Sequence, residues 1–346
     1  MIITMTPLRV SFLGGGTDYP EHFRQHGGAT LATSINKYTY VTVTRLTEFF
    51  DHRIRVSYSR TELCKTVDEI QHPAVRACLE FMNIDGGVEI SVVSDLPART
   101  GLGSSSSFTV GLLHALHGFQ GKVVSREELA AEAVHVERNI IQERVGLQDQ
   151  YACAIGGALH LQFSGNNRVN ACPLVIPPTR AAAMESRLLM FYTGLQRTAH
   201  EVLESQLQRT SAGQITPYLN HLTGLVSDGI DTLTSERPLS EFGQLLHEGW
   251  MLKRQFSDAI SNEFIDDAYG RARRAGAIGG KLLGAGGGGF LLLYVEPEDQ
   301  PAVRAALAGM LEVNFNFDDQ GSRLIFYKPD SQPALVHDAD VQLKVA

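Results

Sequence analysis

The segment from Pro97 to Ser107 combines glycines with hydroxyl side chains in a pattern that suits anion binding. It reads Pro-Ala-Arg-Thr-Gly-Leu-Gly-Ser-Ser-Ser-Ser and precedes an apolar stretch typical of a helix. Glycine lets the backbone turn tightly, and the free amides at a helix start attract phosphate oxygens. Hydroxyl groups there can also bind a magnesium ion. We therefore expect a phosphate loop rather than a plain strand-to-helix turn, but not an ordinary Walker loop, because Gly-x-x-x-x-Gly-Lys-Ser/Thr is absent.

Glu137 is a carboxylate in an otherwise apolar helical row. It shares one face of the expected helix with Val134 and Ile141. A buried, ionised and unpaired carboxylate would cost several kcal/mol or would be neutralised. Either a magnesium ion or an arginine, such as Arg138 or Arg9, would satisfy it, and the residues alone leave both alternatives open.

Three further charged residues are ambiguous when each is taken singly. Asp149 lies among small and apolar residues, where capping of a helix is the more ordinary role of an aspartate. Asp18 follows a glycine turn, which favours aspartate. Arg9 lies in an alternating, strand-like segment that tolerates an outward arginine. Their meaning depends on whether the fold brings them together.

A second glycine-rich run, from Gly279 to Gly289, holds seven glycines in eleven residues. This is more than one turn requires, although a flexible linker would also tolerate it. Because strands are expected on both sides of the run, close approach of its backbone to a ligand or to another domain is the better explanation.

The pattern of elements predicts two domains of α+β class, over residues 1–180 and 181–346. Strands and helices are interspersed without regular alternation, and prolines near residue 177 mark the boundary. Ser125 with Glu128 forms a capping-box pattern that predicts a helix start. Residues 52–58 are expected to pair with a strand over 39–45.

Composition excludes several classes of protein. Hydrophobic residues make up 43% and charged residues 20%, as in folded soluble proteins. The formal net charge of -8 disfavours nucleic-acid binding, and no apolar run is long enough to span a membrane, so we expect a cytoplasmic location. The four cysteines are scattered and predict neither a zinc site nor disulfides, and His114 with His117 is more simply a chance pair than a metal site. A homo-oligomer remains open.

Three motifs in this order resemble those of the GHMP kinases, which include galactokinase, homoserine kinase and mevalonate kinase. The motifs are Pro-Leu-Arg-Val-Ser-Phe-Leu-Gly-Gly-Gly-Thr-Asp-Tyr over residues 7–19, the loop from Pro97 to Ser107, and the glycines from Gly284 to Gly289. The resemblance implies a ribosomal-S5-like first domain, a ferredoxin-like second domain, and substrates bound in the cleft between them. It also implies ATP and Mg²⁺ as cofactors.

The resemblance assigns roles to individual residues. Asp149 would face the acceptor hydroxyl as base or positioning group, and Arg9 would lie beside it as the second catalytic residue. Ser105 and Glu137 would hold magnesium. The ATP phosphates would lie against Pro97, Gly101, Leu102, Gly103, Ser104, Ser105, Ser106 and Ser107. The substrate would contact Gly15, Gly16, Thr17, Asp18, Tyr19, Gly286 and Gly287.

Within the family, Gly-Gly-Gly-Thr-Asp-Tyr-Pro and Leu-Gln-Asp-Gln-Tyr look most like the members that phosphorylate the C1 hydroxyl of D-glycero-α-D-manno-heptose 7-phosphate. Gly15 and Gly16 stand where galactokinase has Glu-His, so a larger sugar is plausible. The expected partners are therefore a small sugar phosphate and ATP. Fucose, galactose or unphosphorylated heptose remain alternative acceptors, and a catalytically silent nucleotide-binding regulator is a further alternative.

A phosphorylated sugar would need a cation for its own phosphate. Arg197, Lys253, Arg254 and Lys281 are candidates, and Lys281 is favoured because glycines surround it. The alternative for each is a solvated surface charge.

Overall fold

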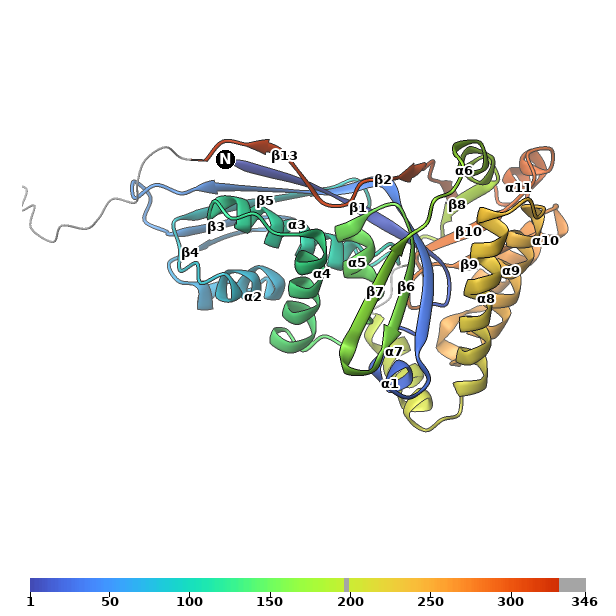
Figure 1. Cartoon of the computed structure of the whole chain (residues 1–346). Helices are drawn as coiled ribbons and strands as arrows, with labels where there is room; N and C mark the ends of the chain where they lie inside the picture. The colour runs from blue at the N-terminus through green and yellow to red at the C-terminus, as the bar shows by residue number, and fades with distance from the viewer. Residues whose placement is uncertain (196–198, 330–346) are drawn as a thin grey trace, which may run out of the picture.

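The computed structural model describes residues 1–195 and 199–329. A large mixed sheet lies in one half of the molecule (Figure 1). Within this part, the strand order along its main path is β13-β1-β2-β5-β3-β4, with β6, β7 and β12 attached beside β2. The strands are β1 (Ile2–Leu13), β2 (Gly28–Arg45), β3 (Ile54–Ser57), β4 (Thr61–Cys64), β5 (Val88–Ser94), β6 (Ala158–Ser164), β7 (Arg168–Pro173), β12 (Phe317–Asp318) and β13 (Arg323–Tyr327).

The long strand β2 organises this sheet, because different parts of it pair with different neighbours. Its first residues, 28–33, pair with β6, and its last, 39–45, pair with β5. The predicted pairing of 52–58 with 39–45 is wrong. β5 occupies that edge of β2, and β3 instead pairs in parallel with β5.

Helices cover the sheet and surround the second half of the chain. They are α1 (Pro20–His26), α2 (Pro73–Phe81), α3 (Ser104–Phe119), α4 (Arg126–His135), α5 (Gln148–Ile155), α6 (Pro178–Glu185), α7 (Ala199–Ser211), α8 (Thr216–Thr234), α9 (Ser240–Lys253), α10 (Glu263–Arg274) and α11 (Gln300–Ala306). Short 3₁₀ segments cover Val67–Glu69, Gly165–Asn167 and Asp258–Ile260, and a π-helical segment covers Val136–Ile140.

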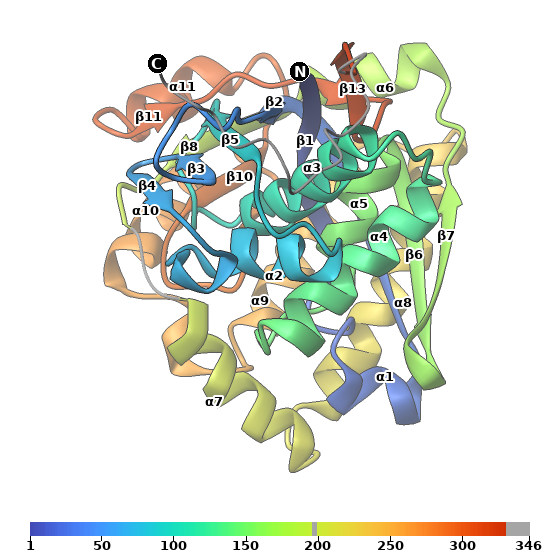
Figure 2. The ribbon, with the colours of Figure 1, turned by 90° about the vertical axis from the view of Figure 1, so that its left-hand side faces the viewer.

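Helix α3 is central to the first half and begins where the glycine-serine loop ends. It lies against β1 and β2, and Figure 2 shows α2, α3 and α4 in front of the sheet. Val110, Leu112 and Leu116 are fully buried, which explains the apolar stretch after the serines. The predicted capping box at the start of α4 is confirmed, since Ser125 and Glu128 each accept the other's backbone N–H.

A second, antiparallel sheet lies in the other half of the chain, with strand order β11-β8-β10-β9 in the described residues. Its strands are β8 (Leu188–Tyr192), β9 (Gly279–Leu282), β10 (Phe290–Tyr294) and β11 (Leu311–Glu312). Helices α8, α9 and α10 gather at the end of the molecule opposite β3 and β4 (Figure 1). The α+β class is therefore confirmed.

The two halves are joined by more than one connection. β12 and β13 come from the end of the chain but pair with β2 and β1, so a division at residue 180 does not separate the two sheets. One apolar core also runs across the halves, and Phe12 of β1 packs edge-to-face on Phe242 of α9 at 5.3 Å between ring centroids.

Several smaller expectations can be compared directly with the structure. All four cysteines are free. His117 contacts Glu132 and His114 contacts Ser322, and no cluster of three metal-ligating side chains occurs among the described residues. Across the same residues, the search for a helix with the length and apolar character of a membrane span finds none.

Candidate active site

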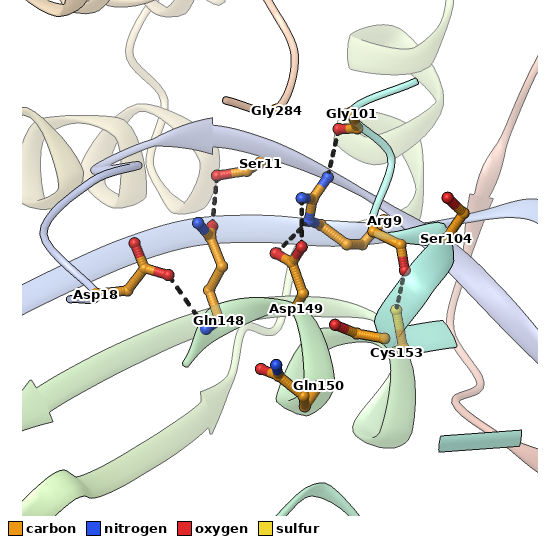
Figure 3. A network of polar contacts seen from close by, with 12 residues as sticks. Arg9, Ser11, Asp18, Gly101, Ser104, Gln148, Asp149, Gln150, Cys153 and Gly284 are labelled. Atoms are coloured by element: carbon orange, nitrogen blue, oxygen red, sulfur yellow. Dashed lines mark hydrogen bonds and ion pairs between the residues drawn. The ribbon is translucent and has the colours of Figure 1, made fainter. Parts of the chain in front are cut away.

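Arg9 and Asp149 form a partly buried ion pair at the centre of the site (Figure 3). Nε and Nη2 of Arg9 donate to the two carboxylate oxygens of Asp149, each at 2.7 Å, and Nη1 donates to the carbonyl of Gly101 at 2.7 Å. Arg9 is only 4% exposed. Burial alone would lower its pKa, but the charge of Asp149 outweighs this, and the pKa of Arg9 lies above its usual value. One side chain thus connects the first strand, the phosphate loop and α5.

Asp149 lies in the first turn of α5, whose N-cap is Leu147. The helix-cap interpretation of Asp149 is therefore wrong, because its carboxylate is occupied by Arg9 rather than by the backbone of its own helix. Bidentate arginine–carboxylate pairs fix orientation as well as charge. The arrangement holds the Asp149 oxygens in one defined position.

Asp18 lies beside this pair and is almost fully buried. Its Oδ1 accepts the backbone N–H of Gly16 at 3.1 Å, and its Oδ2 accepts that of Gln148 at 3.4 Å. Burial and the nearby charge of Asp149 raise the pKa of Asp18. A Cβ on Gly146 would lie 1.8 Å from Asp18 Oδ2, so only glycine leaves room for this carboxylate.

The glycine-serine loop leads directly into α3. Gly103 is the N-cap in left-handed backbone conformation (φ +72°), with no capping side chain, and the first turn carries no acidic residue. The amides of that turn are therefore left for another acceptor, such as a phosphate. Ser104 is half-buried and Ser105 exposed, whereas Ser106 and Ser107 are buried. The four serines thus divide into an outer and an inner pair.

The second glycine run packs backbone to backbone against this loop, which agrees with the predicted close approach of its backbone to another part of the chain. A Cβ on Gly101 would meet the Leu283 carbonyl oxygen at 2.3 Å, and one on Gly284 would meet the Cα of Gly101 at 2.4 Å. Similarly, a Cβ on Gly289 would lie 2.3 Å from the Thr100 carbonyl oxygen. Gly286 and Gly287 instead lie against Ile260. The glycines therefore let the second half of the chain close onto the phosphate loop.

Glu137 is 1% exposed and lies in the π-helical segment after α4. Its Oε2 accepts from Ser106 Oγ at 3.0 Å and from Gln150 Nε2 at 2.5 Å, whereas its Oε1 is buried with no hydrogen-bond partner. Burial raises the pKa of Glu137 to about 7. Of the two alternatives for Glu137, the arginine is not found among the described residues, since Arg9 is paired with Asp149.

The serine that contacts Glu137 is Ser106, whereas Ser105, which the resemblance pairs with Glu137 as a magnesium ligand, is exposed. Helical geometry is the reason, because adjacent residues at the start of α3 point about 100° apart and only one of them can face the buried carboxylate. Ser107 faces the sheet, and its Oγ donates to the Thr6 carbonyl at 3.1 Å.

Lys281, the favoured phosphate-binding candidate, is buried and already bonded. Its Nζ donates to the carbonyls of Ser11 and Phe12 at 2.8 and 2.9 Å, and burial lowers its pKa well below the usual value. It joins β9 to β1 instead of offering an open cation. Arg197 lies outside the described residues.

Lys253 and Arg254, at the end of α9, are also engaged. Lys253 Nζ donates to the carbonyl of Gly284, and burial together with the charge of Arg9 lowers its pKa to about 8. Arg254 forms an ion pair with Asp266 at 2.7 Å.

The remaining expected substrate residues lie in the turn after β1. Thr17 is fully buried, and its hydroxyl donates to the Gly14 and Ala29 carbonyls, so it holds the turn together. Gly16 has φ +104° and packs on Phe256. Tyr19 is half-buried, and burial raises its pKa well above the usual value.

Sequence reasoning missed Gln148 and Gln150, two side chains that support the site. Gln148 Oε1 accepts from Ser11 Oγ at 2.7 Å, and Gln150 donates to Glu137. Both glutamines flank Asp149 in Leu-Gln-Asp-Gln-Tyr, so two amide side chains on either side of an acid were the available signal. The sequence alone could not show which of Ser105 and Ser106 faces Glu137, because that depends on the exact residue at which the helix begins.

Two family models match this chain. The GHMP kinase N-terminal domain matches residues 64–157, and the GHMP kinase C-terminal domain matches residues 232–312, which together is just over half of the chain. The chain belongs to the GHMP kinases. The first model contains the phosphate loop, Glu137 and Asp149, and the second contains Lys253 and the glycine run.

Individual relatives of this GHMP kinase include sugar kinases. It is 29% identical to D-glycero-alpha-D-manno-heptose 7-phosphate kinase of Campylobacter jejuni over 86% of this chain and 90% of the relative. It is 27% identical to a bifunctional fucokinase/GDP-fucose pyrophosphorylase of Arabidopsis thaliana over 90% of this chain but 31% of the relative.

The fold is also that of solved structures in the family. A D-glycero-D-manno-heptose 1-phosphate kinase of Bacteroides thetaiotaomicron aligns with a TM-score of 0.74 at 24% identity, over 93% of this chain and 98% of the other. GHMP kinases use ATP as phosphate donor.

Proposed function

We propose that this protein is an ATP-dependent kinase that phosphorylates the C1 hydroxyl of a sugar phosphate, D-glycero-α-D-manno-heptose 7-phosphate, and forms the 1,7-bisphosphate. The observation that carries the proposal is that the ion pair, the phosphate loop and the buried carboxylate are linked by direct contacts. The Arg9–Asp149 pair lies next to Gly101 of the phosphate loop, and Ser106 at the start of α3 contacts the buried Glu137. The heptose kinase relative supports the choice of acceptor.

The reaction transfers a phosphoryl group between two oxygens. The bond from the sugar O1 to the γ-phosphorus forms, the bond from that phosphorus to the β–γ bridging oxygen breaks, and ADP leaves. The O1 proton passes to Asp149 or is oriented by it. Arg9, which holds both oxygens of Asp149, would also stabilise the charge that develops on the transferred group. The amides at the start of α3 stabilise the same charge.

Magnesium suits the residues around Glu137. The buried Oε1 has no partner, and hard carboxylate and hydroxyl oxygens are the ligands that Mg²⁺ prefers. Glu137, with Ser105 or Ser106, would hold the ion, and its charge would neutralise the phosphate oxygens when bound. Burial raises the pKa of Glu137, and a bound cation would offset this cost of burying its charge.

Two other functions can be compared with this proposal. An unphosphorylated sugar such as fucose is the rival acceptor, because one relative carries a fucokinase. A catalytically silent nucleotide-binding regulator is disfavoured, because Asp149 retains its arginine and Glu137 its serine contact.

An acceptor panel tests the proposal. Purified protein with ATP and Mg²⁺ is assayed for ADP release with heptose 7-phosphate, heptose, fucose and galactose. We expect turnover with heptose 7-phosphate at concentrations where the other sugars are inert. Higher kcat/KM with an unphosphorylated sugar would overturn the choice of acceptor, and no turnover with any sugar would favour the regulator.

A further inference from the structure

Gln148 has a side-chain amide that is held at one end and free at the other. Its Oε1 accepts from Ser11 Oγ at 2.7 Å. Its Nε2 donates to no side chain or carbonyl in the described part of the chain, and the residue is half-buried rather than enclosed. An amide nitrogen carries two N–H donors, so both are available to a ligand.

The position of this amide is set by the packing of α5 on β1. Arg9 and Ser11 are two residues apart in a regularly paired part of β1, so their side chains point to the same face. Arg9 donates to the carboxylate of Asp149. Ser11 donates to the amide of the preceding residue, Gln148. The carboxylate and the amide therefore lie next to each other along one face of β1.

The same segment is joined to the turn after β1. The backbone N–H of Gln148 donates to Asp18 Oδ2 at 3.4 Å, and that of Leu147 donates to the Asp18 carbonyl at 3.1 Å. Figure 3 shows the Gln148 side chain between the carboxylates of Asp18 and Asp149. The free end of the amide is therefore close to the position proposed for the reacting hydroxyl at Asp149.

Structural support alone does not account for this arrangement. Gln150, two residues further along α5, is fully buried, and its Nε2 donates to Glu137. Its donor is thus used inside the protein, on a side of the helix about 200° away from Gln148. Gln148 is instead fixed through its acceptor, which leaves its donors unpaired. Fixing a long side chain costs entropy, and a ligand that meets an already ordered amide does not bear that cost.

A sugar hydroxyl is the ligand group that fits beside this amide. A hydroxyl accepts from an amide N–H while it donates to a carboxylate, and carboxylates lie on both sides of Gln148. The ring oxygen of a sugar can only accept. Because the proposed reaction places the C1 hydroxyl at Asp149, the neighbouring hydroxyl of the sugar is the one on C2.

We propose that Gln148, held by Ser11, donates through Nε2 to the C2 hydroxyl of the acceptor and so selects sugars that carry this hydroxyl. A site that hydrogen-bonds a substrate hydroxyl disfavours an analogue without it, because the polar groups of the site are then left unpaired. The inference rests on the proposed function, since it takes the acceptor to be a sugar that reacts at C1.

The test compares kcat/KM for the best acceptor of the sugar panel and for its 2-deoxy analogue in the wild type, Gln148→Met and Ser11→Ala. We expect the wild type to prefer the sugar with the C2 hydroxyl. Gln148→Met should lower kcat/KM for that sugar by about 3- to 12-fold, the range for one neutral hydrogen bond. Its kcat/KM for the 2-deoxy analogue should stay within about 1.5-fold of the wild type.

Ser11→Ala should give a smaller loss of the same selective kind, because the amide remains but is no longer held in one orientation. The readout in both variants is the ratio of kcat/KM for the two sugars. A loss of folded protein lowers both values equally and leaves this ratio unchanged.

Gln162→Met is the matched control. Gln162 is an exposed glutamine of β6, and its Oε1 also accepts from a neighbouring side chain, Asn170 Nδ2, at 3.0 Å. The control should change kcat/KM for neither sugar.

The outcomes separate this inference from the proposed function. A wild type that does not distinguish the two sugars, or an unchanged ratio in Gln148→Met and Ser11→Ala, overturns the role of Gln148 and leaves the kinase assignment standing. If the ratio falls but the best acceptor is not heptose 7-phosphate, the role of Gln148 stands and the proposed acceptor is wrong. If no sugar is phosphorylated, both are wrong.

Discussion

Single residues of this site perform more than one task. Arg9 orients Asp149 through two hydrogen bonds and holds Gly101 with a third, so one guanidinium sets the distance between the acid and the phosphate loop. Glu137 has one oxygen bonded and one free. The chemistry of the site is therefore concentrated in two carboxylates whose surroundings differ.

Replacement of Asp149 tests its role at the acceptor hydroxyl. Asp149→Asn retains the size of the side chain and one acceptor for Arg9, but it removes the charge. We expect kcat to fall by a factor of about 10²–10⁴, the usual contribution of a general acid or base, with nucleotide affinity nearly unchanged. Steady-state kinetics and calorimetric titration with ATP measure the two effects.

Asp267→Asn is the control for that variant, because Asp267 pairs with Arg271 on the exposed side of α10. It should leave both quantities at wild-type values. Turnover of Asp149→Asn within tenfold of the wild type would show that the carboxylate is not required.

The raised pKa of Glu137 predicts a pH-dependent stability in the absence of divalent cations. The folded protein holds a proton on Glu137 up to about pH 7, whereas the unfolded chain releases it near 4.5. The native state binds more protons in this window, so stability is greatest below 4.5 and falls as pH rises through 7. The total change is on the order of 3 kcal/mol.

Glu137→Gln lacks this titration and serves as the reference. We expect the free energy of unfolding of the wild type, relative to the variant, to decline between pH 4.5 and 7 in urea titrations. Magnesium with ADP should stabilise the wild type more at pH 8 than at pH 6, because protons compete with the cation. A pH-independent difference between the two proteins would contradict the assignment.

At the scale of elements, two loops distant in sequence meet at their backbones. Gly101 and Gly284 approach so closely that neither tolerates a Cβ without displacing the other. The phosphate loop is thus supported from the second half of the chain, and its conformation depends on that support.

Gly101→Ala tests this support. The new Cβ would lie 2.3 Å from the Leu283 carbonyl oxygen, in addition to the strain of φ +86°. Gly213→Ala is the matched control, since Gly213 has φ +72° but nothing within 4 Å of its added Cβ. We expect Gly101→Ala to be less stable than the control by about 1–3 kcal/mol and to raise KM for ATP. Equal stability and unchanged KM would show that the loops do not depend on each other.

At the scale of the whole molecule, Lys281 connects the two halves through hydrogen bonds from β9 to β1. Its Nζ donates to two carbonyls near the end of β1, the strand that also carries Arg9. We expect Lys281→Met to lose about 1–3 kcal/mol of stability, because the carbonyls lose a charged donor. KM for the sugar phosphate should stay close to that of the wild type.

Chemical denaturation and acceptor kinetics measure these effects, with the exposed Lys65→Met as control. The control should change stability by no more than about 0.5 kcal/mol. A selective rise of more than tenfold in KM for the phosphorylated acceptor would show that Lys281 binds the phosphate of that acceptor.

Much of this protein could be predicted from sequence because its signals are local. Glycines at 101 and 103 before four serines indicate a loop and a helix start, and Ser125 with Glu128 indicates a capped helix; both are confirmed. The apolar row around Glu137 correctly indicated a buried carboxylate. Such patterns depend on neighbours three or four residues apart, whose geometry the helix fixes.

Only the tertiary structure decided which of the charged residues meet. Arg9 and Asp149 are 140 positions apart, and nothing local distinguishes their ion pair from an arginine on Glu137. The same applies to Lys281, whose setting among glycines indicated a ligand site but whose ammonium is buried on carbonyls of β1. Desolvation and pairing arise when distant strands pack, so the partner of a buried charge is set by the fold and not by its neighbours in sequence.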